Sequence, residues 1–577
     1  MLNNIRQDDS QENMNDLDPR SNCKPASGSP CKALVEPRTK RGKWCSKLIC
    51  SVATISTIAL ATIGVANAFQ FETSDPDLTI TWDNLIRYNS GVRLQKQNPI
   101  IANSPNFDES DREFGHGQFV TNRLDLLSEF QFDWRKQLGF RVSGAAWYDA
   151  AFHNNVNTAP QLAAVGSYDN NQYSSFTKRW YKGPSGEILD AYGYYNFTAG
   201  DTSGNVKVGR QGFLWGEAII LAAQSISYAQ TPSDFRKAAA TPGATAKEIA
   251  LPLAKVSGQL QVNPQLSFSA EWAFEWQPNR IPEGGTYLGS ADFLFFGPDR
   301  LCISPVLCLR NKGKVNPTST GDYGVAAAWR PPQLDTTLGF FARNYTEKAG
   351  WLKVSVPARS YVQSYAENVN LFGVSAATQV GGVSLGAEAS YRRNAAFPSS
   401  TTDANLQGAR GDSFHSLVNG VASFGKTPLW DSAFLTGELA YSRWLTTRSN
   451  AALYTSCQNA PPNQQDASYG CITKQAWQAA LVFAPAYIAV LPGLDITPSA
   501  TIIYGLRGNF AVLGPGSQNA GSFSTGVTFD YNQQYQARLA YNGYLAHYHT
   551  NGTVVTGSNG SQLQDRGWLS LTLQMNF

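Results

Sequence analysis

The sequence is poor in charge and, past its N-terminal region, has no long apolar segment. Only 15% of its 577 residues are charged, against about a quarter in ordinary globular proteins. The longest apolar run after residue 68 covers residues 479–491 and contains Pro485. A membrane helix needs roughly 20 apolar residues. With a mean hydropathy of −0.28, these features exclude a protein that spans a membrane with helices.

Signatures of chemistry are also missing. The chain has no G-x-S-x-G nucleophile elbow, and its cysteine and histidine spacings do not match a zinc site. We therefore expect no catalytic residues, no metal and no cofactor. His547 and His549 share one strand face, but a strand end beside a loop explains them better than a metal site does.

Aromatic residues, by contrast, are abundant. They make up 12% of the chain, with 14 Trp, 25 Tyr and 30 Phe. Aromatic and small polar residues at low charge favour a β-barrel with a lipid-facing surface and a wet lumen. A secreted β-sandwich or β-helix is the alternative that composition leaves open.

The N-terminal region is predicted to be a leader. Basic residues precede a soft apolar stretch at 48–65, which ends in Ala66-Asn67-Ala68, an A-x-A cleavage pattern. We predict a signal peptide with an extended N-region over 1–68 and a mature chain over 69–577. An uncleaved membrane anchor is the alternative. The mature part has equal numbers of basic and acidic residues, so its charge gives no reason to expect nucleic acid as a partner.

Period-two alternation recurs throughout the mature chain. Residues 120–134, 138–148 and 266–277 each place apolar side chains on one face and polar ones on the other. The same pattern continues in eighteen segments separated by alternating short and long connections. The segments are 78–94, 117–134, 138–151, 188–198, 206–213, 253–262, 266–277, 321–330, 335–344, 368–378, 383–392, 413–425, 432–446, 473–487, 494–505, 522–532, 534–546 and 564–577.

This rhythm predicts the fold class. It is an all-β protein, a single transmembrane antiparallel β-barrel of about 18 strands (16–18 plausible), with long external loops. Short connections such as Asn263-Pro264 and Pro492-Gly493 are expected at the periplasmic end. The long ones include 152–187, 214–252, 278–320 and 447–472.

Two pairs of cysteines and the last residue fit this arrangement. Cys302 lies close to Cys308, and Cys457 to Cys471, in or beside long loops, so proximity favours two local disulfides. The final strand alternates perfectly and ends in Phe577. We interpret Phe577 as the signal read by the outer-membrane assembly machinery, and we expect the outer membrane of a Gram-negative bacterium, with its lipid, as the location.

The chain resembles a family of Proteobacterial proteins called domain of unknown function 1302 (DUF1302). The clearest stretches are VGRQGFLWGE (208–217), PGATAKE (242–248) and WQPNRIPEGGTY (276–287). Segment 212–214 is more apolar than the pattern leads one to expect before Trp215. The resemblance implies an outer-membrane barrel without catalytic residues. It also implies a genomic neighbourhood with an RND-type inner-membrane transporter and a second uncharacterised family, and hence traffic of hydrophobic molecules or lipids.

The connection at 214–252 is the predicted functional segment. Its first half is apolar and should not lie in external water, so we predict that it folds into the lumen as a constriction loop. Its residues are expected to pair with lumen-facing charges of the wall, although such pairing would also serve structure alone. The predicted lumen and constriction residues are Arg210, Trp215, Glu217, Asp234, Arg236, Lys247, Glu248, Arg123, Asp125, Glu129, Arg141 and Glu271.

The apolar content of this loop favours a channel or transport-associated barrel for hydrophobic solutes or lipids, by lumenal passage. A general porin for small ions would need a charged constriction. The alternative is a structural or docking component of an envelope export system, with an RND-type transporter and a periplasmic partner. A general porin or an outer-membrane hydrolase is less favoured.

Overall fold

The structure, a computed structural model, describes residues 69–318, 321–513, 516–557 and 560–577. The predicted leader at 1–68 and its cleavage site lie outside the described residues. None of the described helices is long and apolar enough to cross a membrane.

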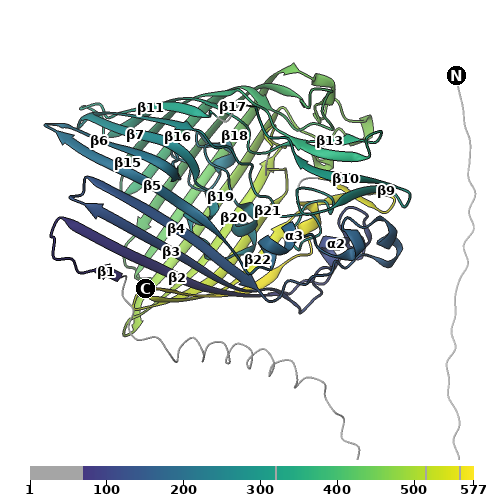
Figure 1. The fold of residues 1–577 in the computed structure, drawn as a ribbon, viewed down its shortest axis with the longest axis horizontal. Coiled ribbons are helices and arrows are strands. Elements are labelled where there is room, and N and C mark those ends of the chain that lie inside the picture. The colour runs from purple at the N-terminus through teal and green to yellow at the C-terminus, as the bar shows by residue number, and fades with distance from the viewer. Residues whose placement is uncertain (1–68, 319–320, 514–515, 558–559) are drawn as a thin grey trace, which may run out of the picture. The chain divides into compact units, whose positions relative to one another are not determined.

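Eighteen strands form one closed antiparallel β-barrel, as the alternation predicted (Figure 1). Closure joins the first of these strands to the last, from Leu85↔Asn576 to Arg93↔Trp568. The strands in chain order are β2 (Leu78–Arg93), β3 (Phe119–Trp134), β4 (Leu138–Asp149), β5 (Ser185–Ala199), β6 (Thr202–Gln211), β7 (Leu253–Asn263), β8 (Leu266–Ala273), β11 (Tyr323–Trp329), β12 (Thr336–Tyr345), β15 (Val369–Val380), β16 (Val383–Ala396), β17 (Arg410–Phe424), β18 (Ser432–Ser449), β19 (Gln475–Leu491), β20 (Leu494–Arg507), β21 (Gly521–Tyr531), β22 (Tyr535–Leu545) and β25 (Trp568–Asn576). A short strand, β1 (Phe69–Phe71), pairs with β2 only.

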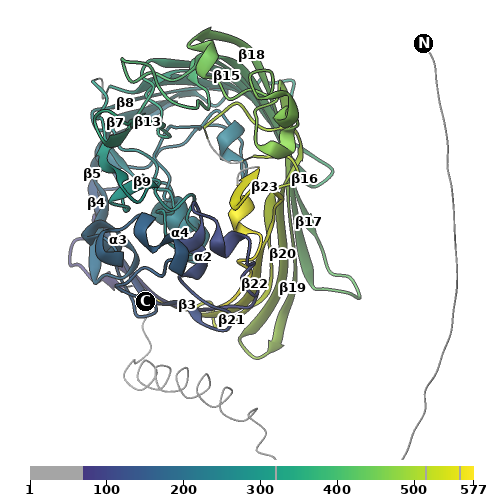
Figure 2. The same ribbon diagram turned by 90° about the vertical axis from the view of Figure 1, so that its right-hand side faces the viewer.

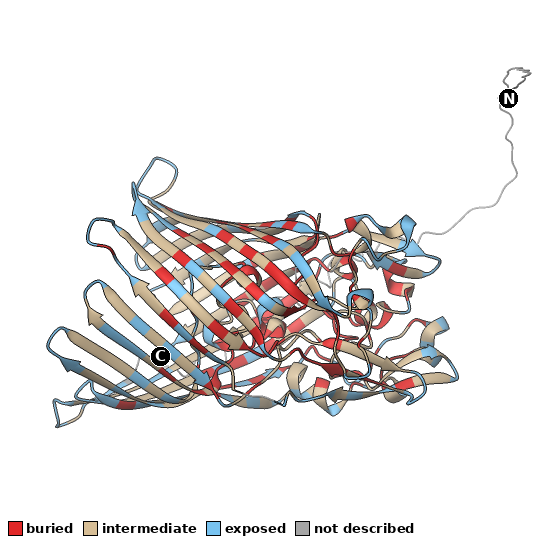
Figure 3. Ribbon diagram, turned by 90° about the horizontal axis from the view of Figure 1, so that it is seen from above, coloured by how far each residue is buried: buried red, intermediate tan, exposed pale blue. Residues whose placement is uncertain are grey.

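Side chains alternate between an outer apolar face and a lumenal face. In β3, Leu124 and Leu126 are exposed on the outside, whereas Arg123 and Asp125 are buried in the lumen. Buried and exposed positions alternate in the same way along most strands (Figure 3). Successive residues of a strand point to opposite faces, so the apolar residues of each strand form the outer skin of the barrel.

The two ends of the barrel differ. Short turns such as Asn263-Pro264 and Pro492-Gly493 close one end, which also holds the C-terminus and is called the turn end (Figure 1). The predicted short and long connections are both confirmed. The long connections gather at the opposite end, called the loop end, where they fold on one another.

Folded elements within the long loops were not predicted. They are α2 (Asp108–Arg112), α3 (Ser175–Tyr181), α4 (Phe235–Ala240), α5 (Ala246–Ile249), β9 (Arg300–Ser304), β10 (Leu307–Lys314), β13 (Trp351–Ser355), β14 (Ser360–Ser364), β23 (Tyr548–Asn551) and β24 (Val554–Gly557). Both disulfides are confirmed. Cys302–Cys308 joins β9 to β10, and Cys457–Cys471 closes the loop between β18 and β19.

Five strand limits lie four residues from their predicted places. β6, β16 and β19 are longer than predicted, whereas β8 and β25 are shorter. The strand predicted at 266–277 ends at Ala273, because Trp276 turns away to pack on Tyr365, with ring centroids 4.7 Å apart. The strand predicted at 564–577 begins at Trp568. Residues before it fold over the loop end instead.

Candidate functional site

The connection between β6 and β7, residues 212–252, lies inside the barrel (Figure 2). We call it the infolded segment. It makes side-chain ion pairs with β2 through Glu248 and Arg87 (2.8 Å) and with β3 through Lys247 and Glu129 (2.9 Å). Its first part hydrogen-bonds to β16 and β18 on the other side of the ring. The segment therefore bridges opposite parts of the wall.

Two lumenal glutamates of the wall bind backbone amides of this segment. Glu438 of β18 accepts hydrogen bonds from Ile219 N (3.1 Å), Ile220 N (2.6 Å) and Leu221 N (2.8 Å). Glu388 of β16 accepts from the amides of Glu217, Ala218 (3.0 Å) and Ile226 (2.7 Å). The chain here has little regular secondary structure, so its buried amides need acceptors from elsewhere. The two carboxylates supply them.

Two lumenal arginines bind the carbonyls of the same stretch. Arg343 Nη1 of β12 donates to Ile226 O (2.7 Å) and Tyr228 O (2.9 Å). Arg392 Nη2 of β16 donates to Ala223 O and Ser225 O (3.0 Å each), and its guanidinium lies 4.1 Å from the Tyr228 ring centroid. Charged side chains of the wall thus hydrogen-bond the backbone of the infolded segment, and these bonds hold its apolar turn in place.

This apolar turn, residues 217–226, also packs against the wall. Leu221 is buried with Leu417, Ala440 and Ala480, which are lumenal residues of β17, β18 and β19. Burying one leucine side chain contributes about 1.5–3 kcal/mol. Both apolar contact and charge-assisted hydrogen bonds therefore hold the turn.

The second half of the segment carries α4 and α5 and is strongly charged. Asp234 caps α4 by accepting from the amides of Arg236 and Lys237 (3.1 Å each). Burial raises the pKa of Asp234, but the adjacent guanidinium of Arg236 and the neighbouring Arg280 outweigh it and hold the pKa at about 2. Lys237 Nζ pairs with Glu187 of β5 at 3.0 Å. Ion pairs with β3 and β5 of the wall therefore hold this half of the segment.

The predicted site residues are only partly brought together. The predicted partners Lys247, Glu129 and Arg141 form one cluster, with Arg141–Glu129 at 2.7 Å. Glu248 binds Arg87, which the sequence did not single out. Asp234 pairs with Arg236 of its own segment rather than with the wall charges that were predicted.

The other predicted residues have separate partners. Arg123 pairs with Asp125 of its own strand (2.9 Å), and Glu271 pairs with Lys255 (2.9 Å). Arg210 alternates with lumenal Gln211, so it lies on the outward side of β6, where it binds Glu275 at 3.0 Å. Glu217 accepts from Ser375 Oγ (3.1 Å). Trp215 is buried against Phe213 and Phe341.

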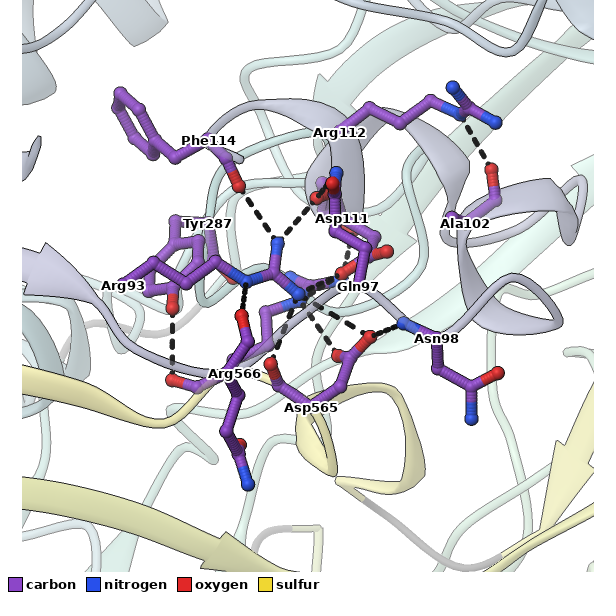
Figure 4. Close-up of polar contacts among 12 residues, drawn as sticks. Arg93, Gln97, Asn98, Ala102, Asp111, Arg112, Phe114, Tyr287, Asp565 and Arg566 are labelled. Carbon is purple, nitrogen blue, oxygen red and sulfur yellow. Dashed lines mark hydrogen bonds and ion pairs between the residues drawn. The ribbon is translucent and has the colours of Figure 1, made fainter. Parts of the chain in front are cut away.

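A buried ionic network ties the loops together at the loop end (Figure 4). Arg93 Nη2 pairs with Asp111 Oδ1 (2.7 Å) and with Asp565 (3.4 Å), and Arg566 also contacts Asp111 (3.3 Å). Tyr287 OH donates to Arg566 O (3.0 Å). Arg93 ends β2, and the other residues come from the connections after β2, β8 and β22, which are far apart in the chain. We call the described residues of these three connections (94–118, 274–322 and 546–567) the loop cap.

The loop cap contains several carboxyl groups shielded from water. Burial raises the pKa of Glu113 to about 8 and that of Glu283 to about 7. Burial, together with the negative charge of Asp108, raises the pKa of Asp292 to about 8. Beneath the cap, a cavity of about 70 Å³ is lined by Glu113, predicted residues Arg123, Asp234 and Arg236, and several tryptophans.

The lumenal wall has an apolar side and a charged side. Because Glu438 points into the lumen, the unbroken register of β18 places Phe434, four residues away, on the lumenal face as well. Phe434 is 52% exposed there, and Ile488 is 55% exposed. The same alternation places an uncharged, largely apolar set of side chains on this face. We call it the apolar lumenal wall, made of Val421, Phe434, Val482, Ala484, Ala486 and Ile488, with the hydroxyl side chains of Ser423, Thr436 and Thr501 among them.

The opposite side of the lumen is polar. Its lumenal residues on β3 to β6 include Glu129, Asp133, Arg141, Tyr194 and Lys207. Tyr194 OH donates to Asp133 Oδ2 (2.6 Å). Among the described residues, no group of three or more His, Cys, Asp or Glu side chains could hold a metal ion.

Comparison with protein families gives one match. The family model described as "Protein of unknown function (DUF1302)" matches residues 49–577, nearly the whole chain. No curated protein matches the chain significantly.

Several solved structures share the barrel architecture at low similarity. OccK1 (OpdK) of Pseudomonas aeruginosa is 11% identical with a TM-score of 0.39, OccAB2 of Acinetobacter baumannii is 9% identical with 0.39, and a BenF-like porin of Pseudomonas fluorescens Pf-5 is 11% identical with 0.38. Each match covers 86% of this chain and 98% of the other. This degree of likeness carries no argument about what passes through the lumen.

Proposed function

The chain belongs to the family described as Protein of unknown function (DUF1302), and from its barrel we propose an outer-membrane channel that passes hydrophobic solutes or lipids through the lumen. One observation carries this proposal, namely the apolar lumenal wall. A lumen that serves ions or sugars gains from polar groups on all sides. Here Phe434 and Ile488 are about half exposed toward the lumen, and the cross-strand neighbours of Phe434 are the uncharged Ser423 and Ala484.

The infolded segment supports the same function. Its apolar turn lies on the lumenal residues Leu417, Ala440 and Ala480, directly above the apolar lumenal wall. A solute that moves past this turn would meet uncharged surface toward the turn end, where Val421, Val482 and Phe434 lie among hydroxyl side chains such as that of Thr436. By the rule for bacterial barrels, short turns face the periplasm, so the path leads from the constriction to the periplasmic side.

The predicted constriction role of the infolded segment stays a prediction. So do the periplasmic partner and the RND-type transporter implied by the family resemblance. The channel alone is therefore the function to test first.

The test is uptake of an apolar probe. Cells that produce the barrel are expected to take up N-phenyl-1-naphthylamine faster than cells without it. Phe434→Asp places a charge on the apolar lumenal wall, and uptake is expected to fall by about tenfold, equivalent to about 1.4 kcal/mol.

Ser269→Asp is the matched control, because Ser269 lies on the lumenal face of β8 away from the apolar lumenal wall. It adds the same charge to the lumen and is expected to leave probe uptake unchanged. Equal loss in both variants, or no loss with Phe434→Asp in a folded barrel, would refute passage along the apolar wall.

A further inference from the structure

Two prolines face each other inside the barrel wall. Pro485 lies in β19 and Pro498 in β20, and they are the only prolines within the described barrel strands. The flanking pairs Phe483↔Ala500 and Tyr487↔Ile496 place them directly opposite each other. Proline has no N–H to donate and is normally found at sheet edges or bulges.

The ladder between β19 and β20 is open at this point. No residue between Phe483 and Tyr487 pairs with β20, although the register is the same above and below the gap. An unchanged register excludes a bulge as the cause. If Pro485 and Pro498 formed a non-hydrogen-bonded pair, their neighbours would pair normally. The gap therefore reflects two missing N–H donors, which leave each proline carbonyl without its partner across the seam.

The outer neighbours of these residues are fully paired. Pro485 pairs with Ala433 of β18, and Pro498 pairs with Val527 of β21, both within unbroken registers. The interruption is thus confined to the seam between β19 and β20. It extends over about four residues, or roughly 13 Å along the strands.

Small side chains line the gap on the lumenal side. Alternation places Ala484 and Ala486 of β19 opposite Ser499 and Thr497 of β20, all facing the lumen. Phe434 is the cross-strand partner of Ala484. The interruption therefore lies directly beside the apolar lumenal wall, and the lumenal residues of these two strands at the gap are small or of medium size.

On the outer face, apolar side chains flank the gap, and the ion pair of Asp431 with Lys426 lies at its turn-end side. Leu481 and Tyr487 lie above and below it on β19 and are 47% and 37% exposed. Unpaired backbone groups in the hydrocarbon region of a bilayer are costly, and a closed barrel normally avoids them altogether. A gap that is retained in the wall beside an apolar lumenal surface suits a passage rather than a structural seal.

We propose that the seam between β19 and β20 is a lateral portal, through which an apolar solute or a lipid acyl chain moves between the lumen and the bilayer leaflet near the turn end. The portal rests on the proposed function, since apolar molecules must first occupy the lumen. Through this portal, an apolar molecule on the apolar lumenal wall could enter the bilayer without passing through the water at the turn end.

The first experiment measures whether acyl chains reach the seam, independently of transport. The full barrel carrying Ala484→Cys is labelled with bimane and reconstituted in brominated phosphatidylcholine. The portal predicts a loss of bimane fluorescence at position 484. Val482→Cys, also lumenal and beside the intact pair with Thr501, is the control and is expected to keep its fluorescence.

Restoring the ladder should close the portal. Pro485→Val with Pro498→Val adds back two N–H donors and outward β-branched side chains, which favour a strand. Two restored hydrogen bonds are expected to lower the open population by about tenfold or more. Quenching at position 484 should then disappear. Absent quenching at 484, or quenching that persists after both substitutions, would overturn the portal.

A second experiment separates the portal from the proposed function. Ala484→Cys with Ser499→Cys is expected to form a disulfide across the gap that lowers uptake of N-phenyl-1-naphthylamine until dithiothreitol is added. Ser524→Cys with Thr501→Cys, across the intact seam between β20 and β21, is the control and should have no effect. Undiminished uptake through the locked seam would refute the portal and leave the channel standing. Quenching at 484 in a barrel that never takes up the probe would refute the channel and leave the seam open.

Discussion

Replacing Glu438 by glutamine should release the apolar turn of the infolded segment. The carboxylate accepts three backbone amides, from Ile219, Ile220 and Leu221. Glutamine has one oxygen, and its NH₂ group cannot accept a hydrogen bond. At least one amide is left without an acceptor, and the remaining bonds lose the assistance of the negative charge.

The magnitude follows from these contacts. Hydrogen bonds to a charged group contribute about 1.5–3 kcal/mol each, neutral ones about 0.5–1.5, and an unsatisfied buried donor costs about 1–3. Glu438→Gln is thus expected to weaken the attachment of the turn by about 2–4 kcal/mol, or roughly 30- to 1000-fold in the released population. The packing of Leu221 on Leu417 and Ala440, worth about 1.5–3 kcal/mol, is the same in both proteins. The bonds of the turn to Glu388, Arg343 and Arg392 also remain, so the loss falls on residues 219–221.

Two measurements check this expectation. Hydrogen exchange at residues 219–221 should accelerate by a comparable factor, and single-channel recordings should show more frequent high-conductance openings. Asp335→Asn is the matched control, because it neutralises an acid in an exposed pair with Arg330 at a turn, where an ion pair contributes little. Unchanged exchange and conductance in a folded Glu438→Gln barrel would refute the view that wall carboxylates hold the turn.

Three further outcomes are expected. The loop cap should become more sensitive to protease as pH rises from about 5 to 8, because the pKa of Glu113 is raised to about 8 in the folded cap, which therefore binds the proton more tightly than the unfolded chain does. The free energy of unfolding of the cap is expected to fall by about 1.4 kcal/mol per pH unit within that window. A Glu113→Gln variant that keeps the full pH dependence would contradict this. Cys457→Ser with Cys471→Ser should destabilise the loop between β18 and β19 by about 3 kcal/mol and speed its proteolysis, while heat-modifiable migration of the barrel stays normal; equal loop proteolysis with and without the disulfide would count against this. Deleting Phe577 removes a residue whose N–H and C=O both bond to Asn84. The deletion is expected to reduce assembly into the outer membrane, measured as the fraction of heat-modifiable protein. Normal assembly would show that the assembly machinery does not recognise the terminal aromatic residue.

The barrel was predictable because its physics is local. A strand that separates lipid from a wet lumen must alternate, and this alternation identified all eighteen strands and most of their limits. Proline and glycine residues indicated the short turns, as at Pro492-Gly493. Sequence proximity sufficed for the disulfides, since each pair closes a short loop.

The partners of the infolded segment were not predictable in the same way. Glu388 and Glu438 look like ordinary lumenal charges in their alternating strands, and nothing local shows that they bind backbone amides 170 and 219 residues away. One signal was present, because neither glutamate has a basic residue opposite it on the neighbouring strands. A lumenal acid without a base needs some other donor, and an apolar loop with unpaired amides supplies one.

This pairing of acids with backbone changes how the charges of the lumen should be counted. Four charged side chains lie on the strands next to the apolar turn, namely Glu388, Glu438, Arg343 and Arg392. Each of them hydrogen-bonds the backbone of the infolded segment and does not face the open lumen. With those charges engaged, the surface left for a solute on that side is the apolar lumenal wall, from Val421 to Ile488. Releasing the turn in the Glu438→Gln variant would therefore do two things together, since it widens the lumen and exposes the carboxylate of Glu388 beside that wall. An apolar probe should then gain little from the wider path, whereas a small cation should gain much more, and this difference in selectivity distinguishes a turn that shapes an apolar route from one that merely narrows a pore.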